Sequence, residues 1–321
     1  MVLWCKTMHV PLIDESTSRL RVVLLLVLSV SMVSSASILI TISVSPSLVK
    51  VFWRTLYGSL FMFIIGAIRG DLPAFKSLQV RTNWPWLVGI GVILSLHFST
   101  WFQSLEMTSI PASVVLVDSS PIFTAILSTI FLGESLRRRS WAGILIAIAG
   151  AIFLVWIDYG LDLGALTGDV LALAGAVFLA IYFIGGRRYA QGMPITVYTS
   201  IIYLVAAIST LGLCLLGGYN ILVFEPTEVL IFIALAIFPT VLGHSVNNYL
   251  LTKVPAYVVS SAVLGEPVGA TILAAVILGR IIEPTELIGF SIILIGVAAV
   301  LADIASKERS QKLSLDNADG T

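Results

Sequence analysis

Charged residues are scarce in this chain, and cysteine is almost absent. Asp, Glu, Lys and Arg together make up 11% of 321 residues, whereas hydrophobic residues make up 58%. A water-soluble domain carries about 25% charged residues, so this composition argues against one. The two cysteines, Cys5 and Cys214, lie far apart and match no metal-binding or redox spacing. We therefore expect neither a metal site nor a disulfide.

The chain contains long stretches without any charged residue, for example at 22–49 and 189–224. A helix needs about 20 apolar residues to cross the hydrocarbon core of a bilayer. Only helices satisfy their backbone hydrogen bonds within one such segment. The sequence therefore predicts an all-α integral membrane protein whose solvent is the lipid bilayer. Ten transmembrane helices are expected, at 22–43, 46–68, 84–105, 111–132, 139–157, 168–186, 194–217, 228–250, 255–279 and 285–303.

The second half of the chain repeats the first. Pro121 and Pro267 hold matching places in two spans, 146 residues apart, and the glycines Gly143 and Gly150 keep this separation from Gly289 and Gly296. Because each copy has an odd number of spans, the second copy must be inserted upside down, as in many alternating-access transporters. The sequence thus predicts two inverted five-helix repeats. The expected division is an N-terminal segment 1–21, repeats 22–157 and 168–303, an outer linker 158–167 and a tail 304–321.

Basic residues predict the orientation. With the N-terminus in the cytoplasm, all of the 18 Lys and Arg residues except Lys50, Arg54 and Arg280 fall on the cytoplasmic side. The positive-inside rule favours this arrangement. Both termini are therefore expected in the cytoplasm, with residues 306–321 as a mobile polar tail. The plasma membrane is the simplest location for a chain with no targeting extension.

Several motifs follow one another in the same order in both copies. The first copy contains Asp118-Ser119-Ser120-Pro121-Ile122 and Leu132-Gly133-Glu134, and the second contains Glu266-Pro267-Val268 and Leu278-Gly279. Their order and spacing resemble the EamA-like family of the drug/metabolite transporter superfamily over nearly all of residues 20–303. The resemblance implies a ten-helix carrier with a central cavity, which moves small organic metabolites such as amino acids, often outward. One departure is Arg280, which stands where the family usually has Glu.

Ionisable residues within the spans are the strongest functional evidence, because a charge at the bilayer centre costs about 3 kcal/mol. Glu266 could bind a cationic substrate group or take up a coupling proton, or it could be a protonated or Arg-paired carboxyl that locks two helices. Asp118 could guard the mouth of the cavity or extend towards the outer interface. Arg54 could bind a carboxylate or phosphate, or form a fixed pair with Asp118 or Glu266. Pro121 and Pro267 are expected to kink their helices and free carbonyls there.

Polar and aromatic residues also follow equivalent spans of the two copies. His97 and Trp101 share one helical face, and His244, Asn247 and Asn248 share a face of the equivalent span. Both stripes are expected to face the cavity, although such groups can also join helices by hydrogen bonds. Tyr182 could add ring surface to the cavity or simply pack between helices. Lys50 is expected to extend towards the interface.

These features favour a secondary transporter over a membrane channel or an intramembrane enzyme. The resemblance to the family implies that the transporter is an exporter. The sequence contains no catalytic motif and no nucleotide-binding loop, so an enzyme is not expected. We expect a small-molecule substrate, protons as a candidate coupling ion, no cofactor and no nucleic acid. The glycines spaced by seven allow two helices to approach closely, and we expect this contact inside one chain. A monomer or a weak homodimer follows.

Overall fold

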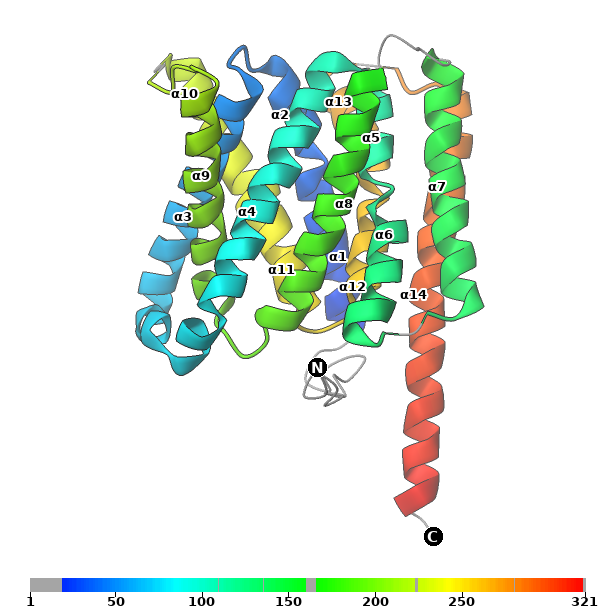
Figure 1. Cartoon of the computed structure of the whole chain (residues 1–321). Helices are drawn as coiled ribbons and strands as arrows, with labels where there is room; N and C mark the ends of the chain where they lie inside the picture. The colour runs from blue at the N-terminus through cyan, green and yellow to red at the C-terminus, as the bar shows by residue number, and fades with distance from the viewer. Residues whose placement is uncertain are drawn as a thin grey trace.

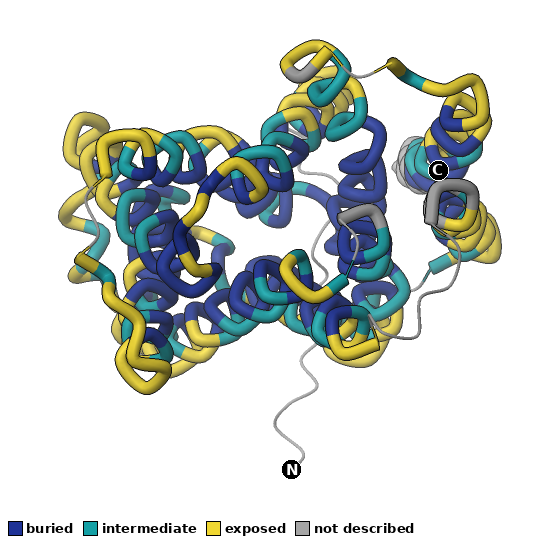
Figure 2. The backbone as a smooth tube through the Cα atoms, turned by 90° about the horizontal axis from the view of Figure 1, so that it is seen from above, coloured by how far each residue is buried: buried dark blue, intermediate teal, exposed yellow. Residues whose placement is uncertain are grey.

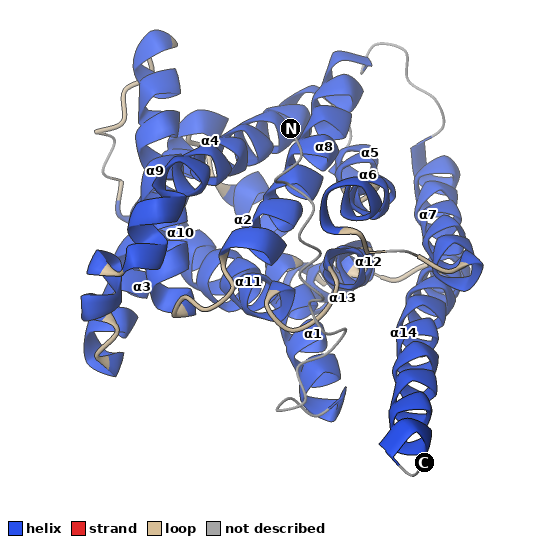
Figure 3. Cartoon of the chain, turned by 60° about the horizontal axis from the view of Figure 1, so that its bottom comes forward, coloured by secondary structure: helices blue, strands red, loops and turns tan. Residues whose placement is uncertain are grey.

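The computed structural model describes residues 19–108, 110–134, 136–159, 166–222, 225–279 and 281–319. Within these ranges every regular element is a helix (Figure 3). The first repeat contains α1 (Arg19–Val33), α2 (Ser35–Ile42), α3 (Ser47–Arg69), η1 (Leu72–Lys76), α4 (Leu78–Met107), α5 (Ile110–Val117), α6 (Ser120–Leu127), η2 (Ser128–Leu132) and α7 (Arg138–Tyr159). The second contains α8 (Leu166–Tyr189), α9 (Ile195–Leu216), α10 (Pro226–Leu235), η4 (Ala236–His244), α11 (Ser245–Leu251), α12 (Ala256–Val263), α13 (Glu266–Leu278) and α14 (Pro284–Asp319). Most of the predicted N-terminal segment and linker, together with Cys5 and Arg280, lies outside the described residues.

The helices have the length and surface of membrane spans. Among the described residues, nine helical stretches are long and apolar enough to cross a membrane, and α7 adds another helix of 22 residues. Large apolar side chains such as Ile68, Leu216 and Val276 are exposed on the outside of the bundle. Buried positions line the inside (Figure 2). The predicted all-α membrane fold is confirmed.

The two repeats run through the bundle in opposite directions (Figure 1). α1 rises from the lower edge of that view, whereas its counterpart α8 descends from the upper edge. Arg19, which begins α1, donates a hydrogen bond to the carbonyl of Ala305 in α14 at 3.5 Å. The start of α1 and the far part of α14 therefore lie at one end of the bundle. We call this end the terminal end and the other the opposite end.

The last helices of the two repeats, α7 and α14, pack side by side at the edge of the bundle (Figures 1 and 3). A Cβ atom added to Gly143 would lie 2.7 Å from the carbonyl oxygen of Gly296, and one added to Gly150 would lie 2.9 Å from the Ile292 side chain. Only glycine permits this approach, so these glycines serve a contact inside the chain. α14 continues as a helix to Asp319, so the tail begins as a continuation of the last span, and its mobility stays a prediction.

Spans four and nine are interrupted near their centres. Span four ends as α5 at Val117 and resumes as α6, with Pro121 in its first turn. Span nine ends as α12 at Val263 and resumes as α13, with Pro267 in its first turn. Proline lacks an N–H and suits the first turn of a helix, where that donor would be unpaired. The predicted kinks are therefore breaks between two helices.

Two further interruptions were not predicted. Span one breaks at Ser34, whose hydroxyl donates to the carbonyl of Glu266 at 3.2 Å. Span eight contains the π-helical segment η4, which carries Pro239. The hydroxyl of Thr240 donates to the carbonyl of Leu235, five residues back, at 2.8 Å. These two irregular segments lie in spans that line the centre of the bundle. π-Helical turns often accompany functional sites.

Candidate functional site

A small cavity lies between the repeats at the level of the helix breaks. Its volume is about 20 Å³, which is room for roughly one water molecule. Spans three, four, eight and nine, which carry most of the predicted site residues, contribute to its lining, and spans one, two and six contribute as well. The cavity is therefore a meeting point of both repeats, closed down in this conformation.

Seven of the nine predicted site residues line this cavity, and each side chain is exposed by 6% or less. They are Arg54, His97, Trp101, Asp118, His244, Asn247 and Glu266. The remaining two, Tyr182 and Asn248, lie next to it. The structure thus brings together residues that are up to 212 positions apart in the sequence (Arg54 and Glu266). That they bind a solute stays a prediction.

Arg54 extends from α3 into the cavity with its guanidinium held on one side only. Its Nε donates to the Thr240 hydroxyl at 2.7 Å, and its Cζ lies 3.9 Å from the centroid of the Phe98 ring. Both terminal nitrogens are buried and have no hydrogen-bond partner within the described part of the chain. The alternative of a fixed pair with Asp118 or Glu266 is therefore not what the structure shows. The fork that binds carboxylates is oriented but unengaged.

Two carboxyl groups face the same cavity. Glu266 is the first residue of α13, where the partial positive charge of a helix N-terminus stabilises an anion. Asp118 sits in the break before α6 and is 1% exposed, so the alternative that it extends to the outer interface is wrong. One oxygen of each group, Oε1 of Glu266 and Oδ2 of Asp118, has no hydrogen-bond partner among the described residues. Buried charges normally have such partners.

Aromatic rings form one wall of the cavity. The rings of His97 and Trp101 stack with centroids 6.1 Å apart, and those of Phe98 and His244 meet edge to face at 5.1 Å. Nδ1 of His97 lies 2.9 Å from the carbonyl of Gly175 in α8, so this ring is also part of the helix packing. Apolar and aromatic walls with a few polar groups are typical of small-molecule sites.

The two asparagines differ in their roles. Oδ1 of Asn247 accepts a hydrogen bond from the Ser29 hydroxyl at 2.5 Å and so joins α11 to α1. Its Nδ2 is buried without a partner among the described residues. Asn248 donates to the Tyr182 hydroxyl and, at 2.8 Å, to the carbonyl of His244. Asn248 and Tyr182 are therefore packing residues beside the cavity, whereas Asn247 combines a helix contact with a polar atom at its lining.

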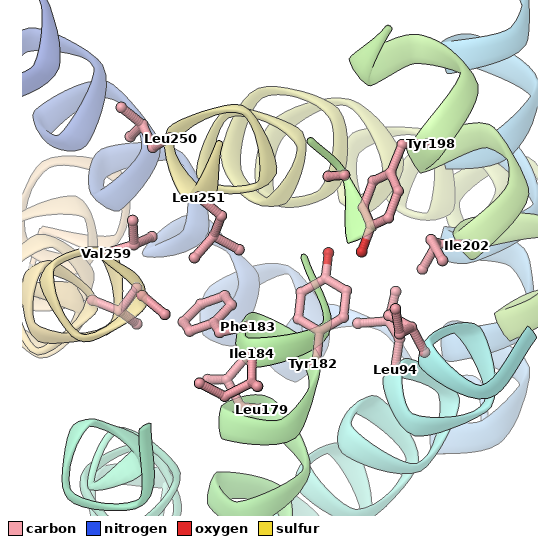
Figure 4. Close-up of a cluster of buried hydrophobic side chains, with 14 of the residues drawn as sticks. Leu94, Leu179, Tyr182, Phe183, Ile184, Tyr198, Ile202, Leu250, Leu251 and Val259 are labelled. Carbon is pink, nitrogen blue, oxygen red and sulfur yellow. The ribbon is translucent and has the colours of Figure 1, made fainter. Parts of the chain in front are cut away.

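An apolar layer separates the cavity from the terminal end. Figure 4 shows the side chains of Tyr182, Phe183, Tyr198 and Leu251 converging from α8, α9 and α11, with the two tyrosine hydroxyls turned towards each other. All four side chains are buried. These side chains lie between the cavity and the terminal end of the bundle.

An ion pair lies on the terminal side of the apolar layer. Nε of Arg187 is 2.8 Å from Oε1 of Glu134, and Nη1 of Arg187 donates to the carbonyl of Leu251 at 3.0 Å. Oε2 of Glu134 accepts a hydrogen bond from the backbone N–H of Ala256 at 3.1 Å. We call these four residues the terminal latch. It joins the connection after η2 in the first repeat to three elements of the second.

Several of these residues were missed by the sequence interpretation. Thr240 follows Pro239, a proline in mid-span that signalled the irregular turn, and Phe98 is next to His97. The terminal latch combines Glu134 of the Leu-Gly-Glu motif with one arginine of the basic pair at 187–188, which was assigned only to orientation. Lys50 was predicted to reach the interface, but it is 4% exposed, and its Nζ donates to the carbonyls of Ile40 and Ser43 at 3.1 and 3.3 Å.

The fold and the site together define a class: a two-repeat helical membrane protein with broken central helices and a charged cavity between its halves, the architecture of membrane carriers. The profile of the EamA-like transporter family matches residues 20–156 and 166–302. The chain belongs to the EamA-like transporter family, within the drug/metabolite transporter superfamily.

Named relatives of the chain are transporters. A probable amino-acid metabolite efflux pump of Salmonella typhimurium is 27% identical over 250 residues, which cover 73% of this chain and 83% of that protein. The threonine/homoserine exporter RhtA of Escherichia coli K12 is 24% identical over 71% of this chain and 73% of its own. The aromatic amino acid exporter YddG of Ancylobacter novellus is 26% identical over 53% of this chain and 58% of its own. A solved crystal structure has the same fold, with a TM-score of 0.71 at 23% identity over 87% of this chain and 96% of that one.

Proposed function

We propose that the chain is a secondary transporter that exports amino acids or related small organic solutes. The observation that carries the proposal is the convergence of Arg54, Asp118 and Glu266 on one buried cavity between the repeats. Buried ionisable groups in membrane helices are costly and mark solute or ion pathways. The names of the relatives support amino acids as the solutes and outward transport as the direction.

Alternating access is the proposed mechanism. The cavity holds roughly one water molecule in this conformation, so an amino acid enters only if the repeats move apart. The apolar layer and the terminal latch close one route to the cavity, and their opening gives access from the terminal end. The breaks at the starts of α6 and α13 are where the spans can bend without losing regular hydrogen bonds. Each repeat, 22–157 and 168–303, serves in this proposal as one moving unit.

The terminal end faces the cytoplasm in this proposal, in the plasma membrane. The distribution of Lys and Arg supports the orientation. A cysteine placed beside Arg138 is expected to react with impermeant reagents from the cytoplasmic side alone, and labelling from outside would reverse the assignment. The use of Gly143 and Gly296 within the chain supports a monomer as the working unit.

Transport by reconstituted vesicles tests the function. Vesicles that contain the chain are expected to exchange labelled amino acids in a saturable manner, which a channel would not do. Glu266→Gln removes the carboxylate while keeping the side chain's size. It is expected to lower the flux at least tenfold and to flatten its pH dependence if Glu266 carries the coupling proton.

A matched control comes from a second buried glutamate. Glu228 is 3% exposed but lies in the first turn of α10, outside the cavity lining. Glu228→Gln is expected to keep most of the wild-type flux. If Glu266→Gln leaves both the flux and its pH dependence unchanged, the role given to Glu266 is wrong. If wild-type vesicles exchange no amino acid, the function itself is wrong.

A further inference from the structure

We infer that the cavity recognises its solute as a zwitterion, with Arg54 binding the carboxylate while Glu266 and Asp118 bind the ammonium group. This inference rests on the proposed function and adds to it the division of labour among the charged residues. It also predicts what the cavity rejects, namely analogues that carry one of the two charges.

The carboxylate subsite follows from the geometry of Arg54. The Thr240 hydroxyl fixes Nε, and the Phe98 ring supports one face of the guanidinium. The two terminal nitrogens are left together on the unengaged edge, buried and without a partner among the described residues. A guanidinium presents this edge to a carboxylate as two parallel hydrogen bonds. Because the edge is oriented before a solute arrives, little side-chain freedom is lost on binding.

The ammonium subsite follows from the two carboxyl groups. Oε1 of Glu266 and Oδ2 of Asp118 are buried acceptors without partners in the described structure. Both residues line the cavity that Arg54 enters, yet the terminal nitrogens of Arg54 bond neither of them in the described part of the chain. An ammonium group has three donors and no acceptor, so two carboxyl oxygens and a third acceptor can satisfy it. One cavity thus holds a guanidinium and two carboxyl groups that do not bond each other. A zwitterion, which carries one charge of each sign, complements this arrangement.

Single-charge solutes leave this cavity in an unfavourable state. An amine without a carboxylate leaves the Arg54 edge buried and unpaired, and a carboxylate without an amine adds a third acid to a cavity that already holds two. A site built to bond a group rejects analogues that lack it, because its own buried polar atoms are then unsatisfied. The competing explanation is that the three residues only hold helices together, and it predicts no such discrimination.

The lining also indicates the side chain of the solute. Trp101, Leu179, Phe183 and Val263 surround the charged residues. Such a wall favours an apolar or aromatic side chain over a charged one. Phenylalanine is therefore a suitable probe, with two analogues that differ from it by one charged group: 2-phenylethylamine lacks the carboxylate, and 3-phenylpropionate lacks the ammonium group.

The experiment measures how well each analogue inhibits phenylalanine exchange in reconstituted vesicles. For the wild-type chain, both analogues are expected to inhibit at least tenfold more weakly than unlabelled phenylalanine. In Arg54→Gln, phenylalanine is expected to bind at least tenfold more weakly, whereas 2-phenylethylamine keeps its affinity. The difference in affinity between phenylalanine and the analogue, which we call the gap, therefore narrows. In Glu266→Gln, the gap between phenylalanine and 3-phenylpropionate is expected to narrow instead.

Two further variants keep the test decisive. Arg54→Lys retains the charge without the fork and is expected to restore part of the discrimination against the amine. Lys50→Gln removes a cation one turn away on the same helix, where Nζ binds backbone carbonyls outside the cavity lining. It is expected to leave both gaps unchanged. Thermal unfolding in detergent identifies any variant that does not fold, and Arg54→Lys then stands in for Arg54→Gln.

The outcomes separate the two proposals. Exchange of phenylalanine or another amino acid, with both analogues inhibiting as well as the amino acid itself, overturns the zwitterion inference and leaves the transporter standing. The zwitterion inference is also overturned if the Arg54 and Glu266 variants narrow the same gap. If no amino acid is exchanged at all, the proposed function fails first.

Discussion

At each end of the bundle a glutamate joins the two repeats, but the two glutamates have different partners. At the terminal end, Glu134 accepts from the cation Arg187 and from the backbone of Ala256. At the opposite end, Glu228 accepts from the Ser43 hydroxyl at 2.6 Å and from the backbone N–H groups of residues 44 and 45 at 3.1 Å each. Both contacts cross between the repeats. Only the first is an ion pair.

The difference indicates which end is closed more firmly. Removing one partner of a buried ion pair costs about 3–5 kcal/mol, since a charge is left unsatisfied. Removing a hydrogen bond to a charged group such as the Glu228 carboxylate costs less, about 1.5–3 kcal/mol. The terminal end also has the apolar layer of Tyr182, Phe183, Tyr198 and Leu251 behind its latch (Figure 4). The terminal end is therefore the more strongly held of the two in this conformation.

The largest expected effect comes from Arg187→Gln, which leaves Glu134 without its cation. We expect the free energy of unfolding to fall by about 3 kcal/mol, measured by thermal or chemical unfolding in detergent. A cysteine at Val259, beside the apolar layer, is expected to become more reactive from the terminal side. Arg188→Gln is the control, because Arg188 is exposed and its loss is expected to change stability by less than about 0.5 kcal/mol. If the two variants had equal effects, the terminal latch would not be what holds the terminal end closed.

An intermediate effect is expected from Gly143→Ala, which disturbs the α7 and α14 contact on the terminal half of the bundle. The new Cβ would meet the backbone of Gly296, which cannot rotate away, so we expect a loss of about 2 kcal/mol. Gly212→Ala is the matched control in α9. No atom lies within 4 Å of a Cβ there, so a small gain of about 0.5 kcal/mol is expected from helix propensity. A neutral Gly143→Ala would show that the two helices are not closely packed in the membrane.

The smallest effect is expected from Glu228→Gln at the opposite end. Glutamine keeps one acceptor oxygen but turns an amide donor towards N–H and O–H groups, and we expect a loss of about 1.5 kcal/mol. Glu225→Gln, at an exposed position three residues earlier, is expected to be nearly neutral. The comparison of the two ends would be reversed if Glu228→Gln destabilised the chain more than Arg187→Gln does.

The fold was largely predictable because its causes are local in the sequence. Charge-free stretches predict the spans, and the 146-residue separation of Pro121 and Pro267 predicts both the repeat and the places where spans four and nine break. The residues of the cavity were predictable for a similar reason. A charged or polar residue in mid-span must face the inside of the bundle, whichever helix it meets there.

The partners of these residues were not predictable, because they come from distant parts of the chain. Arg54 bonds Thr240, and Glu134 bonds Arg187, and nothing in the periodicity of one helix specifies such pairs. Lys50 was expected to extend outward, and Asp118 had an outward direction as one alternative, since long or polar side chains near a span end often extend to water. Here neighbouring backbone carbonyls and a helix break accommodate them instead.

The breaks in spans four and nine have a proline at equivalent positions of the two repeats, but their acidic residues are not at equivalent positions. Counting back 146 positions from Glu266 gives Ser120, and counting forward from Asp118 gives Leu264. Likewise α9, the counterpart of α3, contains no lysine or arginine to mirror Arg54. Two similar repeats thus enclose an asymmetric arrangement of charged residues. A chiral solute would bind in this cavity in a single orientation, from whichever side of the membrane it entered. Its enantiomer would bind differently.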